Sequence, residues 1–154
     1  MDFGEAVAQS VDWSAYELMT GESTQFGDTL VRFLRSRDAA ECQEAWRQIE
    51  NHVFAQDTIY SAAEPTIDVV LAALVSDRPL IKGMLIDLLF LLLNGSSASA
   101  PDLAVRCRLR AQKGVWLLVR LAVTGAEGTR EAIGEVLDLV DPAEADILRS
   151  WLAA

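Results

Sequence analysis

Three side chains of this sequence have types that could perform nucleophilic or metal chemistry: Cys42, His52 and Cys107. A cysteine nucleophile needs a base beside it, and a zinc site needs about four Cys, His or carboxylate ligands. The two cysteines lie 65 positions apart and share a single histidine, so no ligand set or catalytic pair emerges from the spacing. We therefore expect no catalytic residue, no metal and no cofactor, and a protein that is not an enzyme.

Other signatures of catalysis are also missing. The segment from Gly125 to Gly128 lacks the lysine and the preceding strand of a phosphate-binding loop, and no G-x-S-x-G motif occurs. His52 lies at the edge of an apolar helical stripe, which predicts a partly buried, structural histidine. The two cysteines lie in helical apolar patterns and the first residues lack a signal-peptide pattern, so we expect reduced thiols in a cytoplasmic protein.

The chain is acidic, with a formal net charge of −10. Because phosphate contacts need a basic surface, this charge argues against nucleic acid as a partner. It fits a basic protein partner, and it equally fits simple solubility. Residues 101–130 reverse the sign, with six basic and two acidic side chains. We expect this basic stretch either to be a face that is solvated or paired with the acidic segment 131–154, or to form an interaction patch.

The elements that must position any site are organised around residues 79–94. Eleven of the fourteen residues from Leu80 to Leu93 are large and apolar, which is too many for a surface helix. The stretch is also too short for a membrane span, so we expect no membrane partner. It predicts a buried helix that Asp77 caps and that ends in a left-handed turn at Gly95.

Apolar residues three and four positions apart predict further helices before and after this one. Asp38 and Asp141 are expected to cap two of them, and Ser61 with Glu64 a third. One long helix is expected over residues 102–123. The last helix is expected to turn four apolar side chains inward: Ile147, Leu148, Trp151 and Leu152.

The apolar pattern repeats along the chain. An offset of forty residues matches Leu30 to Val70 and Leu34 to Leu74, and an offset of forty-seven matches Leu74 to Leu121. Periods of this length are typical of HEAT and armadillo repeats. We predict one all-α domain over residues 1–154, a short α-solenoid with about three helical hairpins and two terminal caps: 25–56, 61–95 and 102–140 for the hairpins, and 2–18 and 142–153 for the caps.

The segment Gln56-Asp57-Thr58-Ile59-Tyr60-Ser61-Ala62, followed by Pro65, resembles a bacterial HEAT-repeat-like family whose motif is close to H-Q-G-[ST]-V-Y-x-A. Trp13 and the segment Leu34-Arg35-Ser36 are also similar to that family, and the likeness covers about residues 12–95. Ala55 and Asp57 depart from the motif, which has His and Gly there. Most members are uncharacterised and some resemble immunity proteins encoded near toxins, so the resemblance implies binding rather than catalysis.

The second helices of successive hairpins line the concave face of such arrays, where partners usually bind. We expect a partner-binding surface there, joined by the motif segment: Glu41, Glu44, Gln48, Asn51, Gln56, Asp57 and Tyr60. For the motif, the alternative is a buried clasp in which Gln56 satisfies helix-end carbonyl groups. The expected function is a protein-binding module, in its sharper form an immunity or inhibitor protein against a basic toxin. The alternative is a structural or regulatory subunit of a larger assembly or a homodimer.

Overall fold

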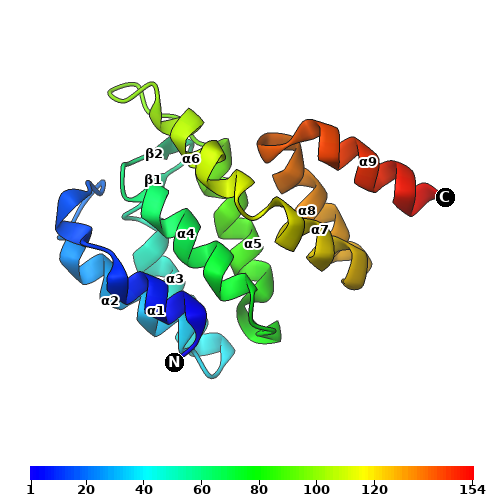
Figure 1. The fold of residues 1–154 in the computed structure, drawn as a ribbon. Helices are drawn as coiled ribbons and strands as arrows, with labels where there is room; N and C mark the ends of the chain where they lie inside the picture. Colours follow the sequence, from blue (N-terminus) through cyan, green and yellow to red (C-terminus); the bar gives the residue numbers. More distant parts are fainter.

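The computed structural model describes residues 1–154 and is built almost entirely of α-helices (Figure 1). The all-α prediction is therefore confirmed. In chain order the elements are α1 (Phe3–Ser10), the 3₁₀ helix η1 (Trp13–Ala15), α2 (Ser23–Leu34), α3 (Ala39–Glu50), β1 (Phe54–Ala55), β2 (Thr58–Ile59), α4 (Ala63–Leu74), α5 (Pro79–Asn94), α6 (Leu103–Gln112), α7 (Val115–Thr124), α8 (Glu127–Val140) and α9 (Pro142–Ala153).

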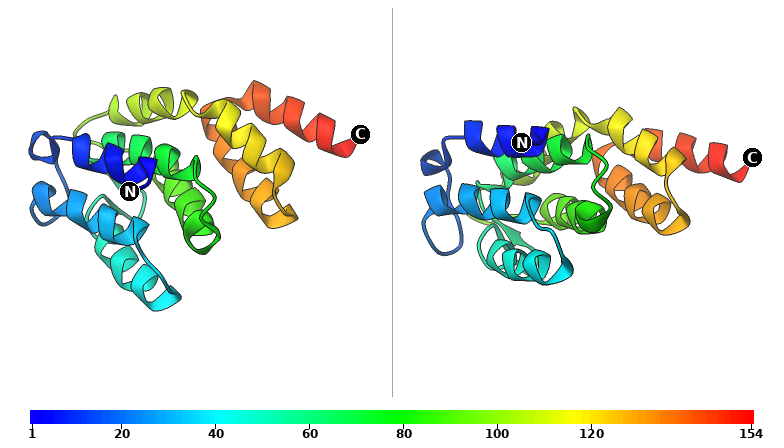
Figure 2. Two further views of the ribbon diagram at one scale, coloured as in Figure 1. Left: turned by 60° about the horizontal axis from the view of Figure 1, so that its bottom comes forward. Right: turned by 90° about the horizontal axis from the view of Figure 1, so that it is seen from below.

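Successive helices pack as hairpins that follow one another through the molecule. The pairs are α2 with α3, α4 with α5, and α7 with α8. The second and third pairs meet because α5 packs against α8, while α6 covers α4 and α9 covers α8. Figure 2 shows that α2 and α3 lie at one end of the array and α9 at the other. This packing is compatible with an α-solenoid.

Helix α5 lies at the centre of the core, as its composition predicts. Its buried side chains include Leu85, Leu88, Leu89, Leu92 and Leu93. Its ends differ from the prediction, however. The N-cap residue is Arg78, and no side chain caps the helix. The Asp77 carboxylate instead forms an ion pair with the Lys82 ammonium, with the two atoms 2.9 Å apart. Gly95 is extended, with φ of −81°, so the predicted left-handed turn is wrong.

The motif segment forms a small hairpin that the sequence analysis missed. Phe54 pairs with Ile59 and Ala55 with Thr58, and the turn residue Gln56 takes the left-handed conformation, with φ of 54°. The segment after α5 extends this hairpin: Ile59 N–H donates to the Ser96 carbonyl at 3.0 Å. Gln56 is exposed, so the alternative in which it forms a buried clasp is wrong.

Close packing against this hairpin explains why residue 95 is a glycine. A Cβ atom at this position would overlap the Cγ2 atom of Ile59. Glycine is therefore required by a close approach between two distant segments, and not by a left-handed backbone.

Besides the Asp77 cap, three helix caps were predicted, and two of these are confirmed. Asp38 accepts a hydrogen bond from Glu41 N–H at 2.9 Å, and Asp141 accepts one from Glu144 N–H at 3.2 Å. The Ser61 cap is wrong: the Ser61 hydroxyl accepts a hydrogen bond from the backbone N–H of Glu17 at 2.7 Å. No side chain caps α4. Ser61 thus joins the segment after η1 to the start of α4.

The single long helix expected over residues 102–123 is two helices, α6 and α7, with a break at Gly114. A Cβ atom on Gly114 would lie 2.6 Å from the Leu71 Cδ2 atom, so the backbone there packs directly on α4. The break lets α6 cover α4 while α7 packs with α8. The last helix also differs: only Leu148 of its four predicted inward residues is buried, and Ile147, Trp151 and Leu152 are exposed.

Helix α1 packs against both α2 and α4, so it bridges the first two hairpins. Gly4 allows this contact, because a Cβ atom there would lie 2.6 Å from the Ala73 Cβ atom and 2.8 Å from its Cα atom. Two ion pairs hold the helix in place. Asp2 pairs with Arg78 at 3.1 Å, and the buried Glu5 pairs with Arg35 at 2.9 Å.

Both cysteines are buried and unpaired. Burial, together with a smaller contribution from the nearby Glu64 carboxylate, raises the pKa of the Cys107 thiol to about 12, because the thiolate would lose its hydration. The unfolded thiol ionises near pH 8.5, whereas the folded one stays neutral well above that value. The folded state then binds the extra proton, so stability should fall as the pH rises above about 8.5.

We therefore expect the wild type to lose about 1–2 kcal/mol more free energy of unfolding between pH 7.5 and 10 than the Cys107→Ala variant. Urea unfolding of both proteins at the two pH values would measure this difference. Comparing the two proteins cancels the titration of tyrosines and lysines. Equal losses would show that the Cys107 thiol does not resist ionisation in the folded protein.

Candidate functional site

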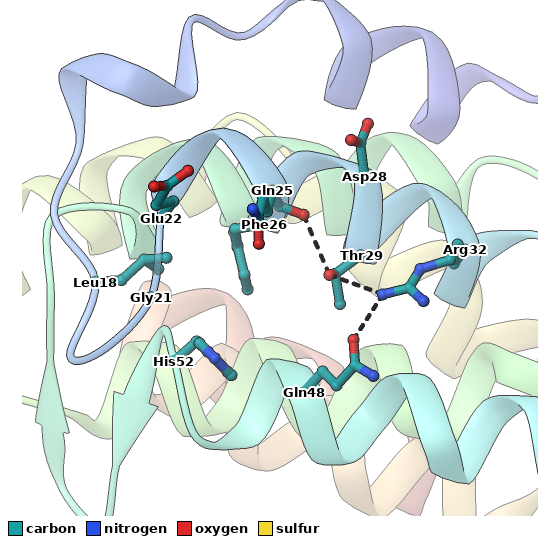
Figure 3. Close-up of a pocket in the computed structure, with 10 residues that line it drawn as sticks. All are labelled: Leu18, Gly21, Glu22, Gln25, Phe26, Asp28, Thr29, Arg32, Gln48 and His52. Carbon is teal, nitrogen blue, oxygen red and sulfur yellow. Dashed lines mark hydrogen bonds between the residues drawn. The ribbon is translucent and has the colours of Figure 1, made fainter.

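Two hollows, one of them larger than the hollows elsewhere on the molecule, lie along one groove between α2 and α3. The first measures about 360 Å³ and the second about 560 Å³, and both are lined by Arg32 and Gln48. Figure 3 shows the first hollow, with the side chains of α2 above it and those of α3 below. Most of the residues that line it are polar or charged, whereas the contact beneath it is apolar: Phe33 packs near Trp46 with ring centroids 6.2 Å apart.

The spacing of polar residues along α2 and α3 gives the groove its two walls. On α2 the polar residues Gln25, Thr29 and Arg32 follow one another at intervals of four and three, and Thr29 is the buried member of this stripe. On α3 the residues Glu41, Glu44 and Gln48 repeat with the same intervals. Residues at these spacings share one face of a helix, so the two polar stripes face each other across the groove.

A chain of hydrogen bonds crosses the groove at its middle. The Arg32 guanidinium donates to the Thr29 hydroxyl at 3.2 Å and to the Gln48 side-chain oxygen at 2.6 Å. Gln48 in turn donates to Glu44 at 3.4 Å. Arg32 has no carboxylate within ion-pair distance, so its charge is held only by neutral acceptors. This crossing divides the first hollow from the second.

One end of the groove is closed by the loop between η1 and α2. The His52 carbonyl accepts a hydrogen bond from Met19 N–H at 2.8 Å, and Gly21 lies against the His52 ring with φ of +84°. His52 is partly buried, as predicted. Its Nδ1 atom is the one buried side-chain polar atom in the protein without a hydrogen-bond partner.

Ion pairs surround the second hollow. Arg37 pairs with Glu41 at 2.6 Å, and its hydrogen bonds to the Glu41 carboxylate lower the pKa of that carboxyl group and raise the pKa of the guanidinium. Arg47 pairs with Glu44 at 3.5 Å. All these groups are largely solvated, so the pairs add little stability. They leave the second hollow close to neutral, whereas Glu22 and Asp28 in the first hollow have no ion-pair partner.

The structure brings together three of the seven predicted binding residues, since Glu41, Glu44 and Gln48 line the groove. Asn51 lies at the end of α3, where its side chain donates to the Arg47 carbonyl at 3.0 Å. The three motif residues do not line this groove: Gln56 and Asp57 are exposed at the turn of the small hairpin, and Tyr60 is partly buried after it.

The sequence analysis missed the opposite wall of the groove on α2. Glu22, Gln25, Asp28, Thr29 and Arg32 line it together with His52. The polar stripe of α2 was a signal that could have found this wall, because it repeats at three and four residues like the stripe of α3. Only α3 was predicted to line the binding surface, because the second helices of hairpins line the concave face of repeat arrays.

The basic stretch of residues 101–130 is partly internal. Arg106 pairs with Glu64 at 2.8 Å, and Arg110 pairs with both Glu64 and Asp68. These contacts join α6 to α4, so the predicted pairing with the acidic C-terminal helices is wrong. Proximity in space, not in sequence, selects the partner, because α6 covers α4. Arg120 lies on the separate helix α7 and has no ion pair.

The negative charge of the protein is concentrated in residues 1–60, which include the groove. Residues 1–60 contain eleven acidic and four basic side chains, a formal charge of −7 out of −10. Four of these acids form ion pairs: Asp2, Glu5, Glu41 and Glu44. The other seven have no ion pair, and Arg32 is the only basic residue of this segment that also has none. The N-terminal half therefore presents an excess of negative charge.

The arrangement can form hydrogen bonds and ion pairs, and it holds no nucleophile activated by a base. No group of three or more His, Cys, Asp or Glu side chains lies close enough together to hold a metal ion. No helix combines the length and apolar character that crossing a membrane requires. Comparisons of the chain with protein-family models, curated proteins and solved structures find no match.

Proposed function

We propose that the protein is a non-catalytic protein-binding module that holds a basic partner protein against the groove between α2 and α3. In its specific form, the proposal is a cytoplasmic immunity or inhibitor protein that neutralises a basic toxin or effector. The observation that carries it is the set of seven acidic side chains in residues 1–60 that lack an ion pair. The resemblance of the motif segment to HEAT-repeat-like proteins supports the same class of function.

Two of these unpaired acids lie at the groove. Glu22 and Asp28 line the first hollow and are exposed, so a lysine or arginine side chain could pair with them without first breaking an internal ion pair. The neighbouring amide of Gln48 adds a hydrogen-bonding group. Long-range attraction between a −10 protein and a basic partner would accelerate association and make it sensitive to salt.

We expect a tagged form of the protein to capture a basic protein from the source organism's lysate at low salt and to release it at moderate salt. The pair Glu22→Gln and Asp28→Asn removes two charges from the first hollow and should weaken this complex about tenfold. The affinity of the purified pair, measured by titration calorimetry at two salt concentrations, would test both effects.

A matched control is the pair Glu131→Gln and Glu135→Gln on α8, which changes the net charge equally at exposed residues without an ion pair. This control should alter the affinity by less than about threefold. Equal weakening by both pairs would show that net charge alone matters and would contradict binding at the groove. A complex insensitive to salt would contradict the electrostatic mechanism.

A further inference from the structure

The C-terminal end of the array exposes a group of large apolar side chains on α7 and α9. Trp116 is 72% exposed, Ile147 61% and Trp151 59%, although a soluble protein normally buries such residues. They surround a hollow of about 320 Å³ that Val119 and Val123 also line. We call this surface the tryptophan face: Trp116, Val119, Val123, Ile147 and Trp151.

The tryptophan face lies on the last layer of the array. Figure 1 shows α9 projecting from the end of the molecule beside α7 and α8. The outermost helices of a solenoid need a polar outer surface if no further layer follows. Here the outer surface carries two exposed indole rings instead, and contiguous apolar surface of this kind marks an interaction site.

The charge near the tryptophan face favours a second copy of this chain as its occupant. Residues 101–154 contain seven basic and eight acidic side chains, so this end is almost neutral, whereas residues 1–60 carry −7. Two copies that meet at their C-terminal ends therefore keep their strongly acidic ends apart. A partner selected by charge would find no large net charge to recognise at this end.

The rim of the tryptophan face is complementary to itself. Arg120 follows Trp116 by one helical turn on α7, and Glu144 lines the hollow from α9. Neither has an ion-pair partner within the chain. In a two-fold interface, the α7 edge of each copy meets the α9 edge of the other. Each Arg120 would then lie opposite the Glu144 of the other copy, so the dimer would contain this ion pair twice.

The exposed apolar area of the tryptophan face is also large enough for a stable dimer interface. A tryptophan presents up to about 250 Å², so the exposed parts of the two indoles and of Ile147 amount to roughly 440 Å² in each copy. About 65% of a homodimer interface is apolar, so two such surfaces correspond to roughly 1,400 Å² of total buried area. Stable interfaces bury about 1,200–2,000 Å².

We infer that the protein forms a symmetric homodimer through the tryptophan face, with Arg120 of one copy paired to Glu144 of the other. This surface lies at the opposite end of the array from the groove between α2 and α3 (Figure 2). The dimer is therefore independent of the proposed function, and a dimer would present two grooves pointing away from each other.

Sedimentation equilibrium of the full chain tests the dimer. We expect a concentration-dependent mass that reaches twice 16.8 kDa, with a dissociation constant of about micromolar order. Trp116→Glu and Trp151→Glu should each raise this constant at least thirtyfold. The control Val105→Glu changes a residue that is 58% exposed on α6 and does not line the hollow, and it should leave the constant within about threefold. A wild type that stays monomeric at about 100 μM would overturn the proposal.

A charge exchange tests the pairing without removing apolar surface. Arg120→Glu and Glu144→Arg should each weaken the dimer about tenfold, because each places like charges opposite one another. The double variant R120E/E144R should restore the wild-type constant to within about threefold. A double variant as weak as the sum of its single changes would overturn the two-fold arrangement. Circular dichroism melting of every variant would confirm that each remains folded.

Discussion

Leu89→Ala is expected to lower the free energy of unfolding by about 3–4 kcal/mol, the largest loss that we predict for a single substitution. Leu89 is fully buried in α5, and α5 packs against both α4 and α8. Helices on opposite sides would have to move together to close the resulting cavity, so little of it should collapse. Urea unfolding followed by circular dichroism would measure the loss.

Leu80→Ala is the matched control for this substitution, because Leu80 belongs to the same helix and is 43% exposed. We expect it to change the free energy of unfolding by less than about 1 kcal/mol. Comparable losses at the two positions would mean that α5 is not buried on the side that carries Leu89.

Gly4→Ala is expected to lower the free energy of unfolding by about 1–3 kcal/mol, although alanine is normally the better helix former. The added methyl group would lie 2.6 Å from the Ala73 Cβ atom and 2.8 Å from its Cα atom. Backbone atoms cannot rotate away as a long side chain can. Helix α1 would have to lift from α4, which would stretch the ion pair between Asp2 and Arg78.

Gly83→Ala is the control for the same chemical change. Gly83 lies within α5 and is exposed, and a Cβ atom there would meet nothing within 4 Å. We therefore expect Gly83→Ala to raise the free energy of unfolding by about 1 kcal/mol. Thermal and urea unfolding of both variants would show changes of opposite sign. A stabilising Gly4→Ala would contradict the close contact between α1 and α4.

The features that could be predicted from the sequence are those set by local spacing. The apolar run of residues 79–94 predicted a buried helix, and α5 is that helix with the same bounds. The caps at Asp38 and Asp141 also depend on residues only three positions apart. Such signals do not require knowledge of which helices become neighbours.

The wrong predictions concern glycines and polar side chains whose partners are distant in the chain. Gly95 is required by Ile59 and Gly114 by Leu71, and neither contact leaves a periodic pattern in the sequence. Without these neighbours, Gly95 resembles an ordinary helix stop and residues 102–123 resemble one helix. Ser61 similarly resembles a cap, although its hydroxyl binds the backbone of Glu17.

The candidate groove was half predictable for the same reason. Its α3 wall follows from the polar spacing of Glu41, Glu44 and Gln48. Its α2 wall carries the same spacing in Gln25, Thr29 and Arg32, but only the packing of the two helices establishes that this stripe faces Gln48 across the hairpin. The assumption that the last helix turns its apolar side chains inward failed because α9 contacts α8 along one narrow side, where Ala145 and Leu148 are buried.

The position of α1 has a consequence for cooperativity. In a simple repeat array each layer touches only its neighbours, so terminal layers can unravel independently of the rest. Here α1 contacts both α2 and α4, and Asp2 and Glu5 connect it to Arg78 and Arg35. The first hairpin cannot detach without breaking contacts to the second. During synthesis, moreover, α1 emerges about 60 residues before α4, so the N-terminal half acquires its full stability only once α4 has also been made.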